Sequence, residues 1–353
     1  EQVVTGTAGT SSTPCVTTGA NQWYFPSGTT QEGATLAISL VNPYPDDAIA
    51  DLSFTTEQGQ ESPQDFQGIV VPARGVVGLD LGSHLRLRAA IATTVSLRVG
   101  RVAAFETQTV QSQSAAAVAN QAPGTTPWPP GVTLVRGASA PGAAWWWPSG
   151  AAGDGANEQY VIYNPGTAEA QVSLQPDLDQ GGADPIQLSV DPHGVAVVTT
   201  NAESRIPKGV GHAAALRVTS GAPVVAARLA LSTSPASPTG VTAVLGSRMA
   251  AGRWLLPGDS STDSVSAALV VYNPASAPVT VSISSLRGPL PGQGAVVIPG
   301  RHRYLLTTPT PTANPALAGP LVVAAPAPVV VERDVAPAKA TGMDESIAVP
   351  LSA

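Results

Sequence analysis

One short pattern occurs three times in this chain and limits its fold more than any other feature. In each copy, a proline inside a tryptophan-containing hexapeptide is followed sixteen positions later by Asn-Pro. The hexapeptides are WYFPSG (23–28), WWWPSG (145–150) and WLLPGD (254–259), and the proline and asparagine pairs are Pro26 and Asn42, Pro148 and Asn164, and Pro257 and Asn273. Because a fixed interval repeated three times is a signature of internal repetition, we expect three copies of one structural unit.

The residues after each Asn-Pro alternate between apolar and polar types. Apolar side chains stand six, eight and ten positions after the asparagine: Ala48, Ala50 and Leu52; Ala170, Val172 and Leu174; Val279, Val281 and Ile283. A period of two with one apolar face predicts half-buried antiparallel strands. Further strand pairs are expected around the turns at Pro72, Pro192 and Pro299, and again in PLVVAAPAPVVVERDV near the end of the third copy.

Each copy therefore holds about seven short strands in about 110–120 residues, which is the size of an antiparallel β-sandwich. We predict an all-β chain of three tandem antiparallel β-sandwich modules of immunoglobulin-like type, at 21–138, 139–248 and 249–353. Residues 1–20 are expected to form a partly flexible N-terminal leader that can add an edge strand. A propeller is disfavoured because this period is far longer than one blade.

The composition fits many short strands and excludes several partners. The chain has 353 residues, 35 glycines, 34 prolines and a net charge of −7. It has only two lysines and no run of arginines, which argues against nucleic acid as a partner. No apolar run reaches the roughly 18–20 residues that span a bilayer. The chain starts at Glu1, and we expect that a signal or anchor segment once preceded it, so that contact with a membrane depends on that missing N-terminal anchor.

The repeated tryptophans and asparagines are interpreted as framework. Trp23, Trp145 and Trp254 share one position, where a large side chain best fills the same core site in each module. Asn42, Asn164 and Asn273 suit a turn that Asn caps and Pro restricts. One residue of each following pair should point outward. The candidates for contact with a ligand or partner are therefore Trp146, Trp147, Tyr24 and, in a loop, Trp128.

Signals for chemistry are weak. His84, His193, His212 and His302 lack metal-ligand spacing, and the single Cys15 can form no internal disulfide; its role is left open. Asp177, Asp179 and Asp184 around Gly181-Gly182 are a weak calcium candidate, since Leu188 stands where a calcium loop needs its bidentate Glu. No catalytic serine motif or cofactor motif is present, so we expect no enzyme and no cofactor. A carboxylate pair from distant strands is left open.

Two Thr- and Pro-rich segments, 119–131 and 307–315, are expected to be extended and solvated, with O-linked sugars as a hypothesis. The W-x-x-P-x-G order, the sixteen-residue interval, the Asn-Pro and the V-P strand turn resemble an actinobacterial family of exported proteins, domain-of-unknown-function family 5719. The resemblance runs from CVTTGANQWYFPSG to the C-terminus. It implies an extracytoplasmic envelope protein with an N-terminal anchor, and it assigns no catalytic residue.

The leading hypothesis is a non-enzymatic extracytoplasmic scaffold or accessory subunit of a cell-envelope complex, because scaffold positions repeat and chemistry does not. The family resemblance makes a membrane glycosyltransferase a candidate partner. One alternative is a carbohydrate-binding array that uses the four aromatic residues on cell-wall polysaccharide, and a second is an envelope hydrolase. The sequence leaves open the oligomeric state and whether the three modules touch.

Overall fold

The computed structural model describes residues 2–6, 9–111, 127–234, 236, 238–257, 265–286, 288–290, 294–308, 320–337 and 342–352. The all-β prediction is confirmed, since every strand pairing in these ranges is antiparallel. Helix within the same ranges is confined to three 3-10 turns, η1 (Gln64–Phe66), η2 (Leu81–Ser83) and η3 (Thr200–Ala202). None of the described helices is long and apolar enough to cross a membrane.

The first repeat forms a unit of two sheets that enclose a hydrophobic cluster. One sheet has the order β11-β10-β4-β8, and the other has the order β3-β9-β5-β6 with β7 also paired to β5. Leu36, Ile38 and Leu40 of β4 face Ala50 and Leu52 of β5 in this cluster, all of them fully buried. The strands are β3 (Gln22–Phe25), β4 (Ala34–Val41), β5 (Ala48–Thr56), β6 (Gly59–Glu61), β7 (Ile69–Val71), β8 (Val76–Asp80), β9 (Ile91–Val99), β10 (Ala103–Val110) and β11 (Gly131–Arg136).

The second repeat forms a unit with the same plan. Its sheets have the orders β12-β17-β14-β15 and β16-β13-β18-β19. The strands are β12 (Ala144–Trp147), β13 (Ala156–Tyr163), β14 (Ala170–Leu178), β15 (Ile186–Val190), β16 (Val195–Thr199), β17 (His212–Gly221), β18 (Val225–Ser232) and β19 (Gly240–Leu245).

The third repeat departs from this plan at one strand. The sequence predicts two strands in PLVVAAPAPVVVERDV, but β26 (Leu321–Pro337) is a single strand that pairs first with β20 and β22 and then with β21 and β27. In the other units Gly100 and Gly221, with φ of 78° and 85°, turn the chain between the equivalent strands. The third unit has Ala-Pro-Ala-Pro at 325–328, and proline holds φ near −65°, so the backbone continues as one strand.

The remaining strands of the third unit follow the repeat. Val279, Val281 and Ile283 of β22 are at most 5% exposed, as the alternation predicts. The strands are β20 (Ala251–Leu256), β21 (Val265–Asn273), β22 (Val279–Ser285), β23 (Gly288–Pro289), β24 (Val296–Ile298), β25 (His302–Thr308), β27 (Asp344–Ile347) and β28 (Val349–Ser352).

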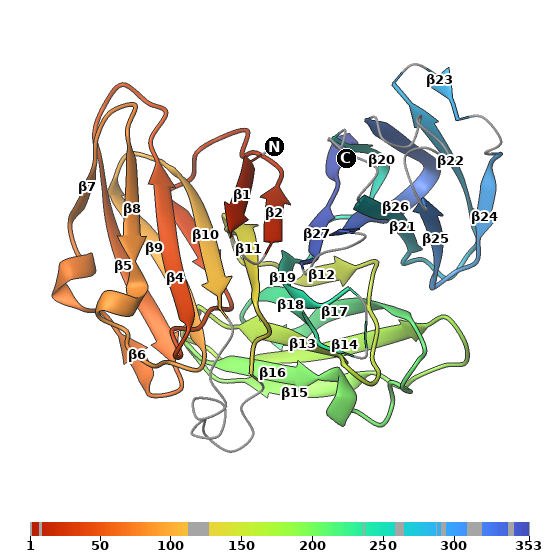
Figure 1. The fold of residues 1–353 in the computed structure, drawn as a ribbon, viewed down its shortest axis with the longest axis horizontal. Helices are drawn as coiled ribbons and strands as arrows, with labels where there is room; N and C mark the ends of the chain where they lie inside the picture. Colours follow the sequence, from red (N-terminus) through yellow and green to blue (C-terminus); the bar gives the residue numbers. More distant parts are fainter. Residues whose placement is uncertain are drawn as a thin grey trace.

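The N-terminal segment lies in the middle of the molecule. Strands β1 (Gln2–Gly6) and β2 (Gly9–Thr13) form a hairpin that stands between the first and third units in Figure 1. β2 contacts β11 and β27, and β19 contacts β11 and β27, so that four strands form a ring. The sequence predicts that residues 1–20 add an edge strand, and in the structure they form a hairpin that contacts β11 and β27.

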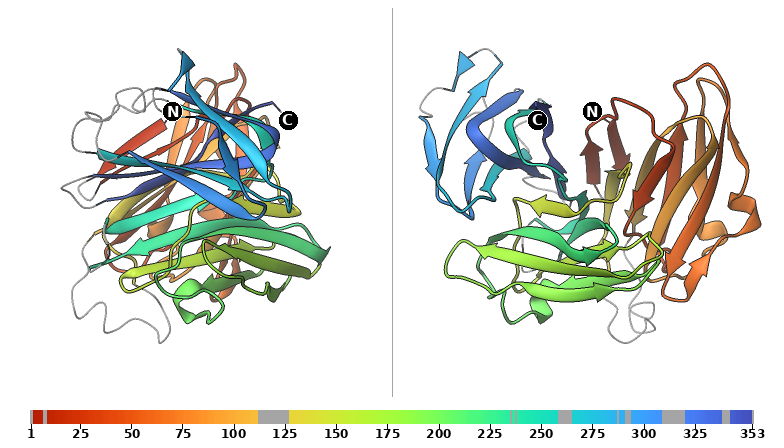
Figure 2. Two further views of the ribbon diagram at one scale, coloured as in Figure 1. Left: turned by 90° about the vertical axis from the view of Figure 1, so that its right-hand side faces the viewer. Right: turned by 180° about the vertical axis from the view of Figure 1, so that it is seen from behind.

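Side chains link neighbouring strands of this ring in a repeated way. Leu134 N–H on β11 donates to Ser11 Oγ on β2 at 2.9 Å, and Ala243 N–H on β19 donates to Thr133 Oγ1 on β11 at 3.2 Å. Ser12 N–H on β2 donates to Asp344 Oδ2 on β27 at 3.1 Å. Each bond satisfies an edge-strand donor that has no partner in its own sheet. The three units are thus arranged in a propeller-like way around the ring, and Figure 2 shows them from the side and from behind.

Candidate functional site

The three repeated tryptophans occupy one buried position. Trp23, Trp145 and Trp254 are at most 2% exposed. Their indole N–H groups donate to the carbonyls of Val102, Val224 and Val329, equivalent residues in the three units, at 2.9–3.0 Å. Burial of the ring with its one polar atom satisfied is what a core position requires.

The three repeated asparagines also make one set of bonds. Asn164 Nδ2 donates to the Ala168 and Val190 carbonyls, and its Oδ1 accepts from Gly166 N–H at 3.0 Å. Asn42 and Asn273 make the corresponding bonds. Each amide therefore closes its own turn and ties it to the next strand, which leaves none of these groups free for a ligand.

The four aromatic candidates for ligand contact lie inside the molecule or between its units. Tyr24 is 6% exposed and packs in the cluster of the second unit, and Trp147 is fully buried there. Trp128 is 9% exposed among residues of the first and second units. Trp146 leaves its own core as expected, but it packs against the third unit with Arg217 5.7 Å above its ring. None of the four is an exposed stacking platform.

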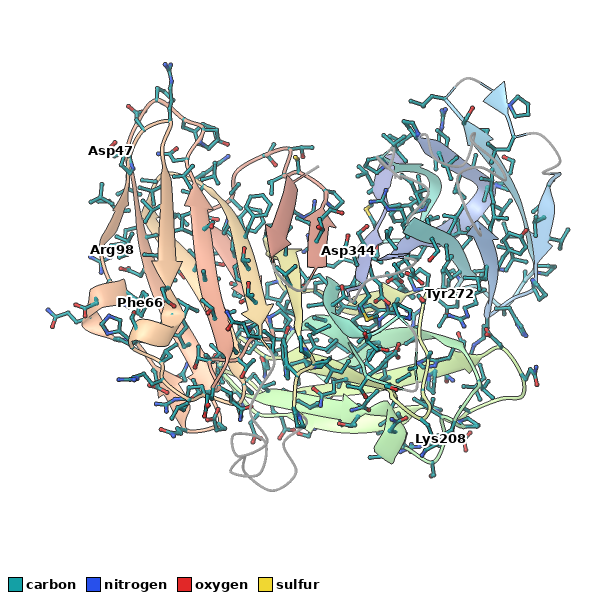
Figure 3. All side chains as sticks on the ribbon, in the orientation of Figure 1. Asp47, Phe66, Arg98, Lys208, Tyr272 and Asp344 are labelled. Atoms are coloured by element: carbon teal, nitrogen blue, oxygen red, sulfur yellow. The ribbon has the colours of Figure 1, made fainter. Side chains whose placement is uncertain are left out.

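The calcium candidates are held by arginines of the third unit. Asp177 accepts from Arg301 at 2.7 Å and from the Tyr272 hydroxyl at 2.5 Å, and burial, reinforced by Asp177, raises the pKa of Tyr272. Asp179 accepts from Nε and Nη2 of Arg303, at 2.7 and 2.8 Å. Asp184 is exposed, and the described residues contain no group of three acids, histidines or cysteines placed to hold a metal. These aspartates join the second and third units, and Figure 3 shows Tyr272 at this junction.

The other singled-out residues are scattered. His84 packs its ring on Phe66 and lies 3.3 Å from Asp65, while His193 and His302 stand at separate strand turns. Cys15 is exposed. The segments 112–126 and 309–319, which include most of the two Thr- and Pro-rich stretches, lie outside the described residues.

An acidic cluster, defined here as Glu158, Glu332, Asp334 and Glu345 around Arg228, joins the second and third units. Arg228 on β18 is fully buried, and its Nη2 lies 2.7 Å from Glu332 Oε1 and 2.5 Å from Glu345 Oε2. Ser149 N–H donates to Glu332 at 2.9 Å, and Ser149 Oγ donates to Asp334 at 2.7 Å. Carboxylates from β26 and β27 therefore meet one arginine and one turn of the preceding unit.

Glu158 belongs to the same cluster from the side of the second unit. Its Oε1 accepts from Ala151 N–H at 2.8 Å, and its Oε2 lies 3.3 Å from Nε2 of the buried His212. The Tyr160 hydroxyl contacts that same Nε2 at 3.0 Å. Glu158 and His212 are both at least 94% buried as side chains, so this is an interior polar network with few partners.

The electrostatics of the cluster favour protons on three of its four acids, Glu332, Asp334 and Glu345. Burial raises the pKa of Glu332 and of Asp334, and it raises the pKa of Glu345 to about 7, because Arg228 offsets only part of the cost of ionising them. Burial also opposes ionisation of Glu158, yet His212 and Arg228 lower its pKa. Burial lowers the pKa of Arg228, but Glu332 and Glu345 outweigh burial and raise it.

The other repeats show that the fold itself does not require Glu158, Tyr160 or His212, although the first unit buries Glu106 at the position of Arg228. The sites of Glu158 and Tyr160 on β13, six and four residues before the asparagine, are filled by Leu36 and Ile38 in the first unit. Ile91 stands where the second unit has His212, since both donate their backbone N–H to the glycine of the PSG turn. The polar residues therefore replace apolar ones that pack well in the same framework.

The same comparison holds for the acids of the third unit. Asp334 and Glu345 stand where the second unit has Leu229 and Ala243, which pack in an apolar cluster against the first unit. One junction between units is thus apolar, and the other carries buried charge at the same positions. Buried ionisable groups that the scaffold can omit mark a candidate functional site.

A cavity of about 310 Å³, called the acidic cavity below, adjoins this cluster. Glu158, Asp334 and Glu345 lie on its wall, and Asn157 stands beside them. Much of the remaining lining is apolar, including Ala151, Ala156, Ala230, Leu231, Ala268 and Val335. A second cavity of about 310 Å³ lies where the three units meet and is lined in part by the three repeated tryptophans. The side chains described on its wall include no buried polar atom that lacks a partner.

Sequence reasoning missed the acidic cluster because its members come from three distant segments. Two local signals were present: Arg228 is the only charge in the apolar run VVAARLALS, and Glu332-Arg333-Asp334 interrupts the apolar β26. A charge in the middle of a buried strand needs a partner, which the sequence does not identify.

The fold and this junction define an all-β protein of three repeated antiparallel units around a central strand ring. The chain belongs to the family of unknown function DUF5719, whose model matches residues 2–253, and this confirms the predicted family over those residues. No curated protein matches the chain. A structure titled "Crystal Structure of Thermotoga maritima 1070" is similar at 16% identity, over 30% of this chain and 94% of that chain, with a TM-score of 0.26.

Proposed function

We propose that this protein is a non-enzymatic extracytoplasmic scaffold or accessory subunit of a cell-envelope complex. The observation that carries the proposal is that the three units are interlocked. A rigid body suits a scaffold, whereas an array of binding modules needs units that move independently.

The same face of each unit packs into the next. Tyr24 and Ala92 of the first unit belong to the hydrophobic cluster of the second. Their equivalents Trp146 and Ala213 in the second unit pack with the cluster of the third. The hydroxyl of Tyr163 contacts Thr94 of the first unit at 2.9 Å, just as the equivalent Tyr272 contacts Asp177 of the second.

The third unit has a copy of this face, and no further unit covers it among the described residues. Leu255 stands at the position of Tyr24 and Trp146, and it is paired with Val349 of β28. Leu351, at the irregularity of β28 between Pro350 and Ser352, is 46% exposed. This apolar sheet face supports the proposal of an envelope protein docked there, with a membrane glycosyltransferase as the candidate partner.

The test is co-purification of the full-length protein from its native envelope in mild detergent. We expect a stoichiometric membrane protein to remain bound, and Leu351→Glu to release it. Val297→Glu is the matched control, because Val297 is a 62% exposed residue on β24 of the same unit. Recovery of the protein alone, or equal loss of the partner in both variants, would contradict the proposal.

The proposal that the protein is not an enzyme is tested separately. The acidic cluster brings together carboxylates that a glycoside hydrolase would need, but the two oxygens of the fully buried Glu332 accept from Arg228 and Ser149. We expect no release of reducing ends from envelope polysaccharides. Release that disappears in Asp334→Asn would make the protein a hydrolase.

We also propose that the three units are immunoglobulin-like β-sandwiches. Support comes from the two antiparallel sheets per repeat and from the separate hydrophobic cluster in each. The alternative is that each repeat is one blade of a propeller rather than a sandwich, with the blades radiating from the ring of β2, β11, β19 and β27. An experimental structure in which each repeat forms one radial blade would favour that alternative.

A further inference from the structure

Three buried hydrogen-bond acceptors on the wall of the acidic cavity have no donor. Asn157 Oδ1, Glu158 Oε2 and Asp334 Oδ1 are buried and have no hydrogen-bond partner. Glu158 is only 5% exposed, and its Oε2 lies 3.3 Å from His212 Nε2, which the Tyr160 hydroxyl contacts more closely, at 3.0 Å. An orphaned buried acceptor costs about 1–3 kcal/mol, so three on one wall call for a common donor.

The donor that fits this wall carries positive charge. Arg228 pairs through Nη2 with Glu332 and Glu345, and Arg303 pairs with Asp179, so neither arginine donates to Asn157, Glu158 or Asp334 in this structure. A cation in the cavity would be attracted by the charge of Glu158 and would offset the cost of ionising Asp334 and Glu345, without displacing any bond that the structure shows. The attraction is strong because the site is removed from water.

The rest of the lining indicates an organic cation. The alanine, leucine and valine side chains of the acidic cavity cannot replace the water shell of a hydrated metal ion. Among the described residues, no acids or histidines are grouped in a geometry that could hold a metal. A short hydrocarbon stem gains free energy against such a surface.

We propose that the acidic cavity binds a small organic cation with several N–H donors, an ammonium or guanidinium group on a short aliphatic stem. The charged group donates to Asn157, Glu158 and Asp334, and the stem lies against Ala230 and Leu231. This site lies at the junction of the second and third units, and the residues that would hold the cation are not part of the sheet face proposed for partner docking. Its occupancy is therefore independent of the scaffold role.

The experiment is titration calorimetry of the full-length protein with n-butylammonium and n-butylguanidinium. Two matched compounds test the chemistry: 1-butanol keeps the stem without the charge, and tetramethylammonium keeps the charge without N–H donors. We expect one or both N–H cations to bind about tenfold or more tightly than either matched compound, because hydrogen bonds to charged groups are worth that factor. A Gly-Lys-Gly peptide separates the two sources of such a group, since it will bind more tightly than butylammonium only if the natural ligand is a peptide side chain.

Variants connect binding to the site. Asp334→Asn and Glu158→Gln should each weaken binding about 10- to 100-fold. Asp46→Asn removes the same charge from an exposed loop of the first unit and should leave binding unchanged. Near-UV circular dichroism checks folding, and if Glu158→Gln does not fold, Asn157→Ala takes its place.

Several results would overturn the proposal. These are equal binding of 1-butanol or tetramethylammonium, no binding of either N–H cation at 50 mM (a concentration about 50-fold above a weak Kd of 1 mM), and unchanged affinity in Asp334→Asn. Binding of Ca²⁺ that excludes the organic cations would also contradict it.

Discussion

At the scale of single residues, the three repeats act as controls for one another. The same site in the framework holds Leu36 in one unit and Glu158 in another, so the type of residue can be separated from what the fold demands. The backbone conformation at equivalent positions is also the same in the three units. Arg74, His193 and Arg301 occupy one turn position with φ of 52–59°, a conformation that costs a residue with a side chain about 1–2 kcal/mol. Such strain at every copy shows that the turn is imposed by the strands around it.

Gly221 allows the sharpest test at this scale. Its φ is 85°, and a Cβ atom built on it would lie 2.0 Å from the Glu169 carbonyl oxygen. We expect Gly221→Ala to reduce the free energy of unfolding by about 3 kcal/mol or more, since backbone strain and a clash with the main chain add together. Urea unfolding followed by circular dichroism measures the change.

Gly181 supplies the control. Its φ is 83°, but no atom lies within 4 Å of the added Cβ. Gly181→Ala should therefore cost only about 1 kcal/mol, the strain alone. Equal costs for the two substitutions would show that the clash is relieved by movement of β14.

At the scale of strands, the sequence predicts the strands in which apolar and polar residues alternate, because the alternation determines which side chains face the core. All nine alternating positions after the three asparagines are at most 5% exposed, because a half-buried strand leaves only one face for apolar residues. The continuous β26 and the central hairpin were not predicted. In β26 the prolines resemble a turn, and they remain in the strand because it bends from one sheet to the other there. The hairpin has few apolar residues, since side-chain hydroxyls and Asp344 hold it in place.

Asp344 gives this ring a pH dependence. Burial outweighs the bonds from Ser11 and Ser12 and raises the pKa of Asp344 to about 6. The folded state therefore binds more protons than the unfolded state between about pH 4 and 6, and stability decreases as the pH rises through that window. Asp344→Asn cannot ionise, so its stability relative to the natural protein should improve by about 2–3 kcal/mol from pH 4 to pH 7.

Asp51 is the control for this prediction, because its pKa is shifted in the opposite direction from that of Asp344. A hydrogen bond from Arg98 lowers the pKa of Asp51, so this carboxylate contributes stability above its unfolded pKa and loses it as the pH falls. Asp51→Asn should therefore lose stability relative to the natural protein as the pH rises from 3 to 5. Denaturant titrations at a series of pH values measure both variants, and parallel curves for Asp344→Asn and the natural protein would contradict the assignment of Asp344.

At the scale of the whole molecule, the number of units was predictable and their contacts were not. The repeat spacing predicts three units. In the structure each copy encloses its own hydrophobic cluster. No local pattern shows that Tyr24 packs into the second unit or that Asp177 and Asp179 meet arginines of the third, since the partners lie about 124 residues apart. The acidic cluster was missed for the same reason.

The molecule should consequently unfold as one body. The junction of the second and third units holds the buried Arg228 between Glu332 and Glu345, and removal of one member of a buried ion pair costs about 3–5 kcal/mol. We expect a single calorimetric transition for the natural protein. Arg228→Met should lower the temperature of that transition by several degrees or separate an earlier one for the third unit, because two carboxylates lose their buried counter-ion.

Arg205 provides the matched comparison, since it pairs with Glu203 at 2.8 Å on the surface. Arg205→Met should cost less than about 1 kcal/mol, as exposed ion pairs do. Adding Glu332→Gln and Glu345→Gln to Arg228→Met removes the uncompensated charges and should restore part of the lost stability. Two well-separated transitions in the natural protein would mean that the units are independent, and both the junction and the scaffold proposal would then be wrong.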